Sequence, residues 1–474
     1  MKLARSGITL YIAEMVGAVL SFVGILYFAR ELGASILGVF FLFQALTGVF
    51  SMVSNLGIRA GISKRMSEGK KPGEFLSSGI LLKLGVLLLV VLVIELGSSY
   101  INEYVGVQIA GLVIITVIFR DLGHLLVHVL RGELRVSESA LLLFVNKVVW
   151  IGVAVVLISM EYELYGLVYG VIVGLVAKTL VGLYLVSTTP TLPSMEAASS
   201  IWQYSKYTII PSIDTYAHNW TDVLIMGIFL SSAAVGAYEI AWRIIGPIFL
   251  LTSSISSTVF PQISAWDAEG ESDRIERIIP KALTPALILI IPAFFGAALL
   301  SFEALSLLFG TEFGAAALAL PILIAGLIPR AFRSIAGKTL EGIDKPQFVN
   351  RASIVDIVAN VVLNAILIWQ IGLVGAAIAT SLSYTLGALL RWYYLRQYLT
   401  LQIPYRELGW CITSAVGMFT AVGLLQQTIV VDTTVRLFAL VSVGIVVYGA
   451  IILIYAPLRR TIVQQTSRMI RTTP

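Results

Sequence analysis

Long apolar runs that contain very few charged residues follow one another along the whole chain. A bilayer crossing needs about 20 apolar residues, and helices satisfy their own backbone polar groups inside lipid. Fourteen runs are long enough to span, near residues 8–29, 36–57, 76–96, 106–130, 138–159, 163–187, 206–231, 234–263, 281–302, 315–337, 348–370, 372–395, 408–428 and 433–456. The sequence therefore predicts an all-α membrane protein with about 14 transmembrane helices.

The overall composition agrees with this prediction. Of the 474 residues, 58% are apolar and 12% are charged, whereas soluble proteins carry about 25% charged residues. An ordinary soluble enzyme, a nucleic-acid-binding protein and a disordered scaffold are excluded. The single cysteine, Cys411, excludes an internal disulfide and a cysteine-based metal cluster.

Basic residues are concentrated in every second connection between the predicted spans. These connections contain Arg59, Lys64, Arg65, Lys70, Lys71, Arg131, Arg135, Lys206, Arg274, Arg277, Lys281, Lys338, Lys345, Arg391, Arg396 and Arg406. The chain ends add Lys2, Arg5, Arg459, Arg460, Arg468 and Arg471, whereas the other connections contain mainly acids: Glu103, Glu161, Glu163, Glu303, Glu312 and Asp432. Cytoplasmic loops are enriched in Lys and Arg, so both termini are expected in the cytoplasm, with the protein in the cell membrane.

The chain resembles itself at an offset of about 200–210 residues. The segment LRGELR at 130–135 corresponds to LEGIDK at 340–345, and FVNK at 144–147 corresponds to FVNR at 348–351. Because six spans separate the copies, both would face the same way and form parallel repeats. The alternative is that short cytoplasmic turns look alike because all of them need Gly and charge.

The repeat predicts two six-helix bundles around a central cavity, followed by two extra helices. The expected boundaries are an N-terminal bundle at 1–187, a cytoplasmic linker at 188–205, a C-terminal bundle at 206–396, and two helices with a tail at 397–474. This arrangement is typical of a transporter that works by rocking its two halves. No connection is long enough for a soluble catalytic domain, so an enzyme is not expected.

The first two spans carry a set of short motifs. FARELG at 28–33 is followed by LGVF at 37–40 and NLGIR at 55–59. Together they resemble the opening of polysaccharide-biosynthesis flippases in the multidrug/oligosaccharidyl-lipid/polysaccharide exporter superfamily. Independently of the resemblance, Gly33 can adopt the positive φ that a tight turn between these spans requires.

The resemblance implies a function for the whole chain. It implies a flippase that moves a polyprenol-linked oligosaccharide from the cytoplasmic to the outer leaflet by alternating access, for surface polysaccharide or glycoprotein biosynthesis. Membrane lipids and glycosyltransferases or a polymerase of the same pathway are the expected partners, and nucleic acid is not. The alternatives are a drug/cation antiporter of the same superfamily and a non-transporting membrane component of a glycosylation complex.

Ionisable side chains inside the predicted spans are the candidate binding residues, because such groups usually face a cavity or each other. Asp214, His218 and Asp222 fall at i, i+4 and i+8 and share one helical face over about 12 Å. Binding of a pyrophosphate-sugar headgroup and internal ion pairing are the two interpretations of this set. The other candidates are Arg243 with Glu239 four residues before it, Arg120, Glu14, and Arg30 at the outer interface, which serves as a lipid anchor or a phosphate contact.

Neither a metal nor an organic cofactor is expected. Asp121, His124 and His128 could place three metal ligands on one helical face, but further ligands and a catalytic purpose are missing. The chain also has no G-x-x-x-x-G-K-[ST] nucleotide motif. Either removal of the product or a coupled ion, H⁺ or Na⁺, must therefore drive transport.

Overall fold

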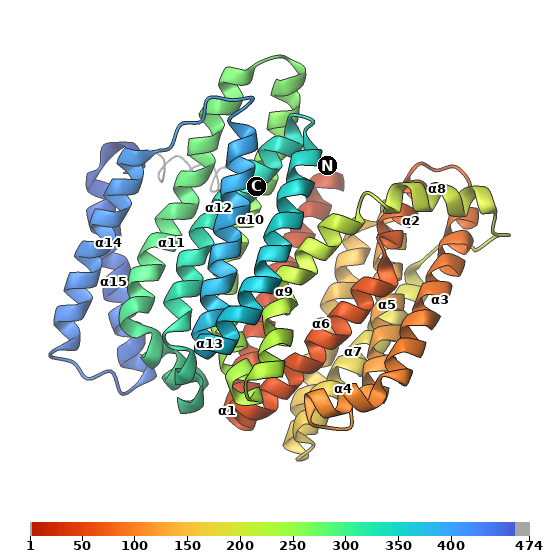
Figure 1. Ribbon diagram of the computed structural model, residues 1–474, viewed down its shortest axis with the longest axis horizontal. Coiled ribbons are helices and arrows are strands. Elements are labelled where there is room, and N and C mark those ends of the chain that lie inside the picture. Colours follow the sequence, from red (N-terminus) through yellow and green to blue (C-terminus); the bar gives the residue numbers. More distant parts are fainter. Residues whose placement is uncertain (1, 460–474) are drawn as a thin grey trace. The chain divides into compact units, whose positions relative to one another are not determined.

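The computed structural model describes the backbone of residues 2–459 and the side chains of residues 16–249 and 259–459. Within this part of the chain every regular element is a helix (Figure 1), which confirms the predicted all-α class. Among the described residues, ten helices are long and apolar enough to cross a membrane. The chain is therefore a multi-span membrane protein, while the count of fourteen crossings and the internal repeat stay predictions.

The chain divides into two compact units, Met1–Gly236 (unit 1) and Ala237–Pro474 (unit 2). Unit 1 contains α1 Lys2–Asn55, α2 Ile58–Ser67, α3 Pro72–Leu96, α4 Ser98–Val105, α5 Ala110–Gly132, α6 Val136–Ser159, α7 Glu163–Leu185, α8 Met195–Ser205 and α9 Ile209–Phe229. The division falls within α10 Ser232–Ala268. The predicted linker includes α8, and the predicted bundle boundaries stay predictions.

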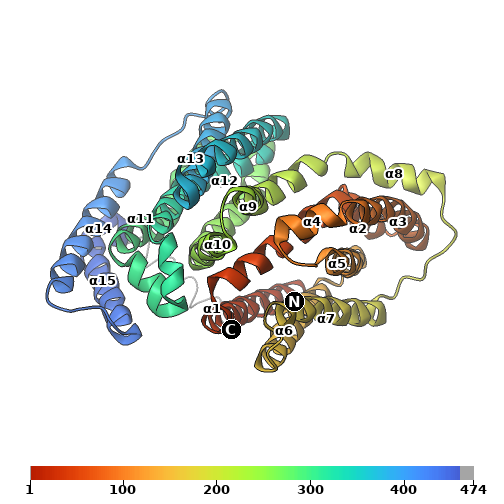
Figure 2. The same cartoon turned by 60° about the horizontal axis from the view of Figure 1, so that its bottom comes forward.

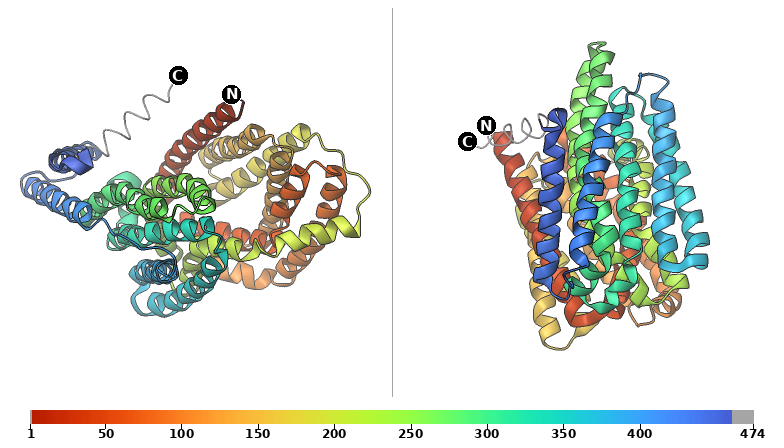
Figure 3. Two further views of the ribbon diagram at one scale, coloured as in Figure 1. Left: turned by 90° about the horizontal axis from the view of Figure 1, so that it is seen from above. Right: turned by 90° about the vertical axis from the view of Figure 1, so that its left-hand side faces the viewer.

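Unit 2 contains the rest of α10 and the remaining helices. They are α11 Ser272–Phe309, the short 3₁₀ helix η1 Thr311–Ala316, α12 Ala319–Gly342, α13 Pro346–Leu395, α14 Tyr405–Gln426 and α15 Thr434–Ile454. Helix α12 packs along α13, and α11 packs against α12 and α14. Helices α14 and α15 lie side by side (Figure 3) and share an apolar core with α11.

Two of the helices are interrupted at glycine. Helix α1 is kinked at Gly33, with φ 74° and ψ 176°, and α13 is kinked at Ile371 and Gly372, where Gly372 has φ 62° and ψ −138°. Residues with a Cβ rarely adopt such angles. The positive φ predicted for Gly33 is confirmed, and each kink separates two of the predicted spans.

Unit 1 is organised around two groups of helices. Helices α6 and α7 lie side by side (Figure 2) and pack against α1. On the other side, α2, α3, α5 and α8 share an apolar cluster that includes Ile62, Leu76, Val129 and Ile201. Ser194 caps the start of α8 by accepting a hydrogen bond from the Ala197 amide at 3.1 Å. This packing brings the charged residues of α2, α3 and α5 into the interior of unit 1.

Candidate functional site

The three candidates on α9 lie on one face, as their spacing requires. His218 and Asp222 are buried, and Asp214 is largely buried. The His218 Nε2 lies 3.5 Å from Asp214 Oδ1, and Asp222 Oδ1 accepts a hydrogen bond from the Val223 amide at 2.9 Å. Two carboxylates and an imidazole along one buried face provide acceptors for hydroxyl groups.

Glu239 and Arg243 form the ion pair that their spacing predicts. Arg243 Nη2 lies 3.1 Å from Glu239 Oε2 within α10. Glu239 is buried, whereas the Arg243 side chain is 42% exposed. The internal ion pair is therefore formed, with one partner buried and the other half-exposed.

The other three candidates have different surroundings. Arg120 on α5 is half-buried and donates a hydrogen bond from Nη2 to Gln44 Oε1 on α1. Arg30 is exposed on α1, just before the kink at Gly33. The Glu14 side chain lies outside the described residues, as do the C-terminal Arg460, Arg468 and Arg471.

A buried carboxylate on α5 connects three elements of unit 1. Asp121 is 1% exposed, and it pairs with Arg59 Nη2 of α2 at 2.7 Å and with Lys83 Nζ of α3 at 2.7 Å. Ser54 Oγ of α1 donates a further hydrogen bond at 3.0 Å. The sequence places Arg59 among the loop cations, because it follows the Gly57 turn. In the structure Arg59 instead lies within α2 and is buried, so it is an interior cation.

Lys178 on α7 is the second interior feature that the eight candidate residues omit. It is 1% exposed, and it makes no hydrogen bond or ion pair with any described residue. Gly123 on α5 makes room for it, because a Cβ there would lie 2.3 Å from Lys178 Cε. Arg59 and Arg120 lie close enough to repel its charge. A buried ammonium group without a carboxylate partner is costly, so it favours the arrival of an anion.

The interior between α2, α3, α5 and α7 of unit 1 is therefore cationic. Arg59, Lys83 and Lys178 are buried and Arg120 is half-buried, and Asp121 is the one carboxylate paired with this group among the described residues. Arg59 and Lys83 engage Asp121, the carboxylate of the set formed by residues 121, 124 and 128. The arrangement is suited to phosphate oxygens, which basic side chains bind with charge-assisted hydrogen bonds.

Unit 2 contains its own buried carboxylate. Asp356 on α13 is fully buried and pairs with Arg333 Nε at 2.8 Å and Arg391 Nη1 at 2.9 Å. Arg391 also donates from Nη2 to Ser353 Oγ at 2.6 Å. Arg330 lies against aromatic rings, with Cζ 3.4 Å from the ring centre of Phe249, and Tyr384 and Trp242 further out. These contacts join α10, α12 and α13 through charged side chains.

Long apolar helices with buried charges in their interior define a polytopic helical membrane protein. The family described as lipid II flippase MurJ matches residues 73–456. The chain belongs to this family of membrane flippases, and the resemblance to flippases of the exporter superfamily is confirmed.

Two curated relatives come from Haloferax volcanii. The "Probable low-salt glycan biosynthesis flippase Agl15" is 40% identical over 470 residues, which cover 99% of this chain and all of the relative. The "Probable flippase AglR" is 29% identical and 98% of each chain is covered.

Solved structures show the same fold. The lipid II flippase MurJ in an inward closed conformation has a TM-score of 0.79 at 17% identity, covering 94% of this chain and 98% of that one. An inward-facing MATE family transporter of the MOP superfamily has a TM-score of 0.66 at 16% identity, covering 83% and 97%. These similarities establish the fold alone.

Proposed function

We propose that this protein moves a lipid-linked oligosaccharide from the cytoplasmic to the outer leaflet by alternating access. The observation that carries the proposal is the excess of buried positive charge between α2, α3, α5 and α7 of unit 1. A diphosphate that joins a polyprenol to a glycan supplies the negative charge that this interior lacks. A relative named as a glycan biosynthesis flippase supports the same cargo.

The cationic residues would have two roles, phosphate binding and helix packing. Lys178 and Arg120 have no carboxylate partner among the contacts described above, so they would receive the phosphate oxygens first, and the Arg120 guanidinium can bind two oxygens at once. Arg59 and Lys83 already pair with Asp121. The Asp121 carboxylate therefore weakens their attraction for a ligand phosphate. The Asp121 pairs would mainly hold α2, α3 and α5 together.

The α9 face and the α10 ion pair would serve the sugar part of the cargo. Asp214, His218 and Asp222 offer hydroxyl acceptors along one face of α9. Arg243 and Glu239 are the corresponding groups of unit 2. Glu14 and Arg30 complete the proposed set, with Arg30 at the outer membrane interface, where a basic side chain can reach lipid phosphate.

We also propose the cell membrane as the location, with both termini in the cytoplasm. The headgroup would enter the protein from the cytoplasmic side while the lipid tail stays in the bilayer. Coupling to H⁺ or Na⁺ and removal of product by glycosyltransferases or a polymerase are the two driving forces that the proposal allows.

Translocation by the purified protein tests the function. Proteoliposomes are loaded with a polyprenyl-diphosphate-linked oligosaccharide, and a membrane-impermeant glycan-modifying reagent reports which leaflet holds the headgroup. We expect the protein to accelerate headgroup movement over that in empty vesicles. A drug/cation antiporter would instead exchange protons on addition of a cationic drug and leave the glycolipid in place. That result would overturn the proposal.

A pair of variants connects the activity to the site. Lys178→Met should reduce the rate of headgroup movement about tenfold or more, because one charge-assisted contact is worth roughly 1.5–3 kcal/mol. Lys64→Met removes a half-exposed lysine of α2 and should have little effect. Equal loss in both variants would show that overall charge, rather than the interior site, matters.

A further inference from the structure

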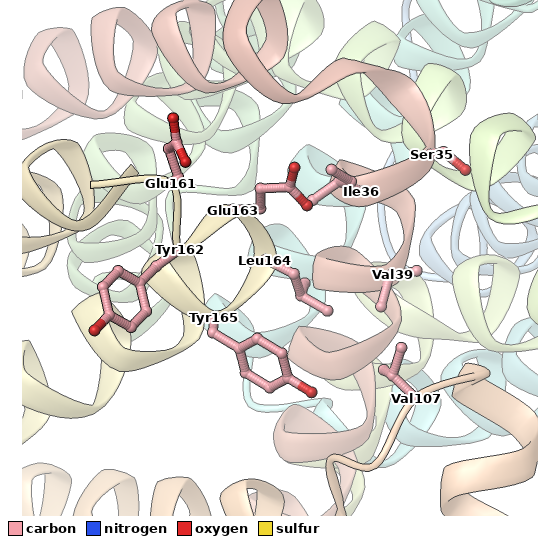
Figure 4. A pocket seen from close by; sticks show the side chains of 9 residues that line it. All are labelled: Ser35, Ile36, Val39, Val107, Glu161, Tyr162, Glu163, Leu164 and Tyr165. Atoms are coloured by element: carbon pink, nitrogen blue, oxygen red, sulfur yellow. The ribbon is translucent and has the colours of Figure 1, made fainter. Parts of the chain in front are cut away.

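One end of unit 1 carries a cavity that the proposed transport path does not use. It has a volume of about 450 Å³ and lies where the α6–α7 connection meets α1 just after the Gly33 kink (Figure 4). Val107, between α4 and α5, lines it and also lines a second cavity of about 440 Å³. The two cavities therefore adjoin, and the charge pattern of the connections predicts that they open on the outer face.

The first cavity combines carboxylates with aromatic rings. Residues 161–165 supply Glu161, Tyr162, Glu163 and Tyr165 to its lining. Figure 4 shows the Glu163 carboxylate directed toward α1 and the Tyr165 ring directed toward Val107. Tyr165 also stacks on Tyr169, with ring centres 6.0 Å apart. Neither carboxylate makes an ion pair or hydrogen bond with a described residue, so both can accept hydrogen bonds from a ligand.

The backbone of this segment is held in an unfavourable conformation. Glu161 has φ 67° and Glu163 has φ 42°, in the left-handed region that residues with a Cβ disfavour. Glycine or asparagine would be less strained at such positions. Strained residues of this kind cluster at active sites and ligand clamps, and here two of them are glutamates that line one cavity.

The charge of the lining identifies the class of ligand. No Lys or Arg lines either cavity among the described residues, and the second cavity adds Ser99, Asn102, Glu103 and Gln108. Phosphate and acidic sugars would be repelled. A hard divalent cation takes six or more oxygen ligands, which the apolar wall formed by Ile36, Val39 and Leu164 does not supply.

A neutral saccharide satisfies every part of this lining. Its hydroxyl groups would donate charge-assisted hydrogen bonds to carboxylates, and its C–H face would lie on a tyrosine ring, which presents an apolar surface beside a polar tip. The combined volume is in the range of small-ligand sites. We propose that the two cavities form an outer-face binding site for a neutral oligosaccharide. The assignment rests on the proposed function, since a translocated glycan is the ligand that would reach this face.

Saturation-transfer NMR on the full chain in nanodiscs tests the proposal. The probes are N-acetylchitotetraose, maltotetraose and mannotetraose as neutral sugars, and tetragalacturonate as the acidic control. We expect transfer to at least one neutral sugar and none to tetragalacturonate. Tyr165→Ala and Glu163→Gln should each weaken that binding about tenfold. Tyr184→Ala, which alters an exposed tyrosine near the far end of α7, should leave it unchanged.

A stability measurement separates binding from a structural role. Glu161→Gly relieves the strained φ, so we expect a higher melting temperature together with weaker sugar binding. A residue kept only for structure would not show these opposite changes. Absence of Tyr165-dependent transfer from all three neutral sugars would overturn the proposal. Binding of Ca²⁺ alone that depends on Glu161 and Glu163 would overturn it as well.

The outcome can be told apart from failure of the flippase function. Lys178→Met should lose headgroup translocation and keep its affinity for the neutral sugar. Wild-type protein that binds the sugar through Tyr165 but moves no glycolipid would contradict only the proposed function. Wild-type protein that moves glycolipid but binds no neutral sugar would contradict only the outer site.

Discussion

At the scale of single residues, replacing Lys178 is expected to lower the transport activity and to raise the stability. Its buried ammonium has no carboxylate partner among the described residues, so Lys178→Met should remove an unfavourable charge and keep most of the volume. We expect the free energy of unfolding to rise, by an amount comparable to the roughly 1–4 kcal/mol seen when buried ion pairs are replaced by apolar residues. Thermal unfolding followed by tryptophan fluorescence measures the change. Lower stability in this variant would mean that the ammonium is compensated by a partner.

Replacing Asp121 should lower the stability, in contrast to replacing Lys178. Asp121→Asn leaves Arg59 and Lys83 buried without a carboxylate, which should destabilise unit 1 by about 3–5 kcal/mol. Adding Lys83→Met to the same chain removes one of the two stranded charges, so part of the loss should return. A double-mutant cycle on the unfolding free energies measures this coupling. Additive effects of the two changes would contradict a direct interaction between them.

At the scale of elements, the kink in α1 depends on Gly33. Its angles, φ 74° and ψ 176°, lie in a region that is essentially restricted to glycine. Gly33→Ala should therefore cost about 1–3 kcal/mol of unfolding free energy, measured by chemical or thermal unfolding in detergent. Gly85→Ala on α3 is the matched control. A Cβ there would meet nothing within 4 Å, so helix propensity predicts a gain of about 0.5–1 kcal/mol.

The connection after α7 is anchored by Glu133, which follows the last residue of α5. Its carboxylate accepts hydrogen bonds from the Ser187 amide and from the amide and hydroxyl of Thr188. Arg135 Nη1 lies 3.0 Å from Glu133 Oε2. Burial raises the pKa of Glu133, but these donors outweigh it and hold the pKa below the usual 4.5. The stabilisation is therefore complete above pH 4.5 and is lost as the pH falls through the lowered pKa.

Hydrogen exchange at the Ser187 and Thr188 amides tests this anchor. After correction for intrinsic rates, protection should be constant from about pH 7 to pH 5 and fall toward about pH 3. Glu133→Gln should show low protection at every pH. Protection that is unchanged at low pH in the wild type would show that the carboxylate does not hold this connection.

At the scale of the whole molecule, local patterns carried the prediction of the fold, and long-range contacts limited the prediction of the site. Apolar runs and the Gly33 turn are local signals, and the structure has helices over these runs and a break at this glycine. The Asp121 cluster joins residues 62 and 38 positions apart, which no helical spacing reveals. Arg59 looks like a loop cation until α2 is seen to be a helix packed on α5. Lys178 lies within the predicted span 163–187, but its lack of a carboxylate partner depends on how α5 packs against α7.

The orientation of the chain is the remaining property that the charge pattern predicts for the molecule as a whole. The native Cys411 is buried, so single cysteines can be introduced at exposed positions and labelled with a membrane-impermeant maleimide. Because basic connections stay in the cytoplasm, Ser99→Cys between α3 and α5 should react in intact cells. Ser67→Cys at the end of α2 and Thr191→Cys before α8 should react only after permeabilisation. Labelling of the Ser67→Cys and Thr191→Cys variants, but not of Ser99→Cys, in intact cells would place the tyrosine and glutamate cavity on the cytoplasmic side. The cavity could then bind a glycan only before translocation.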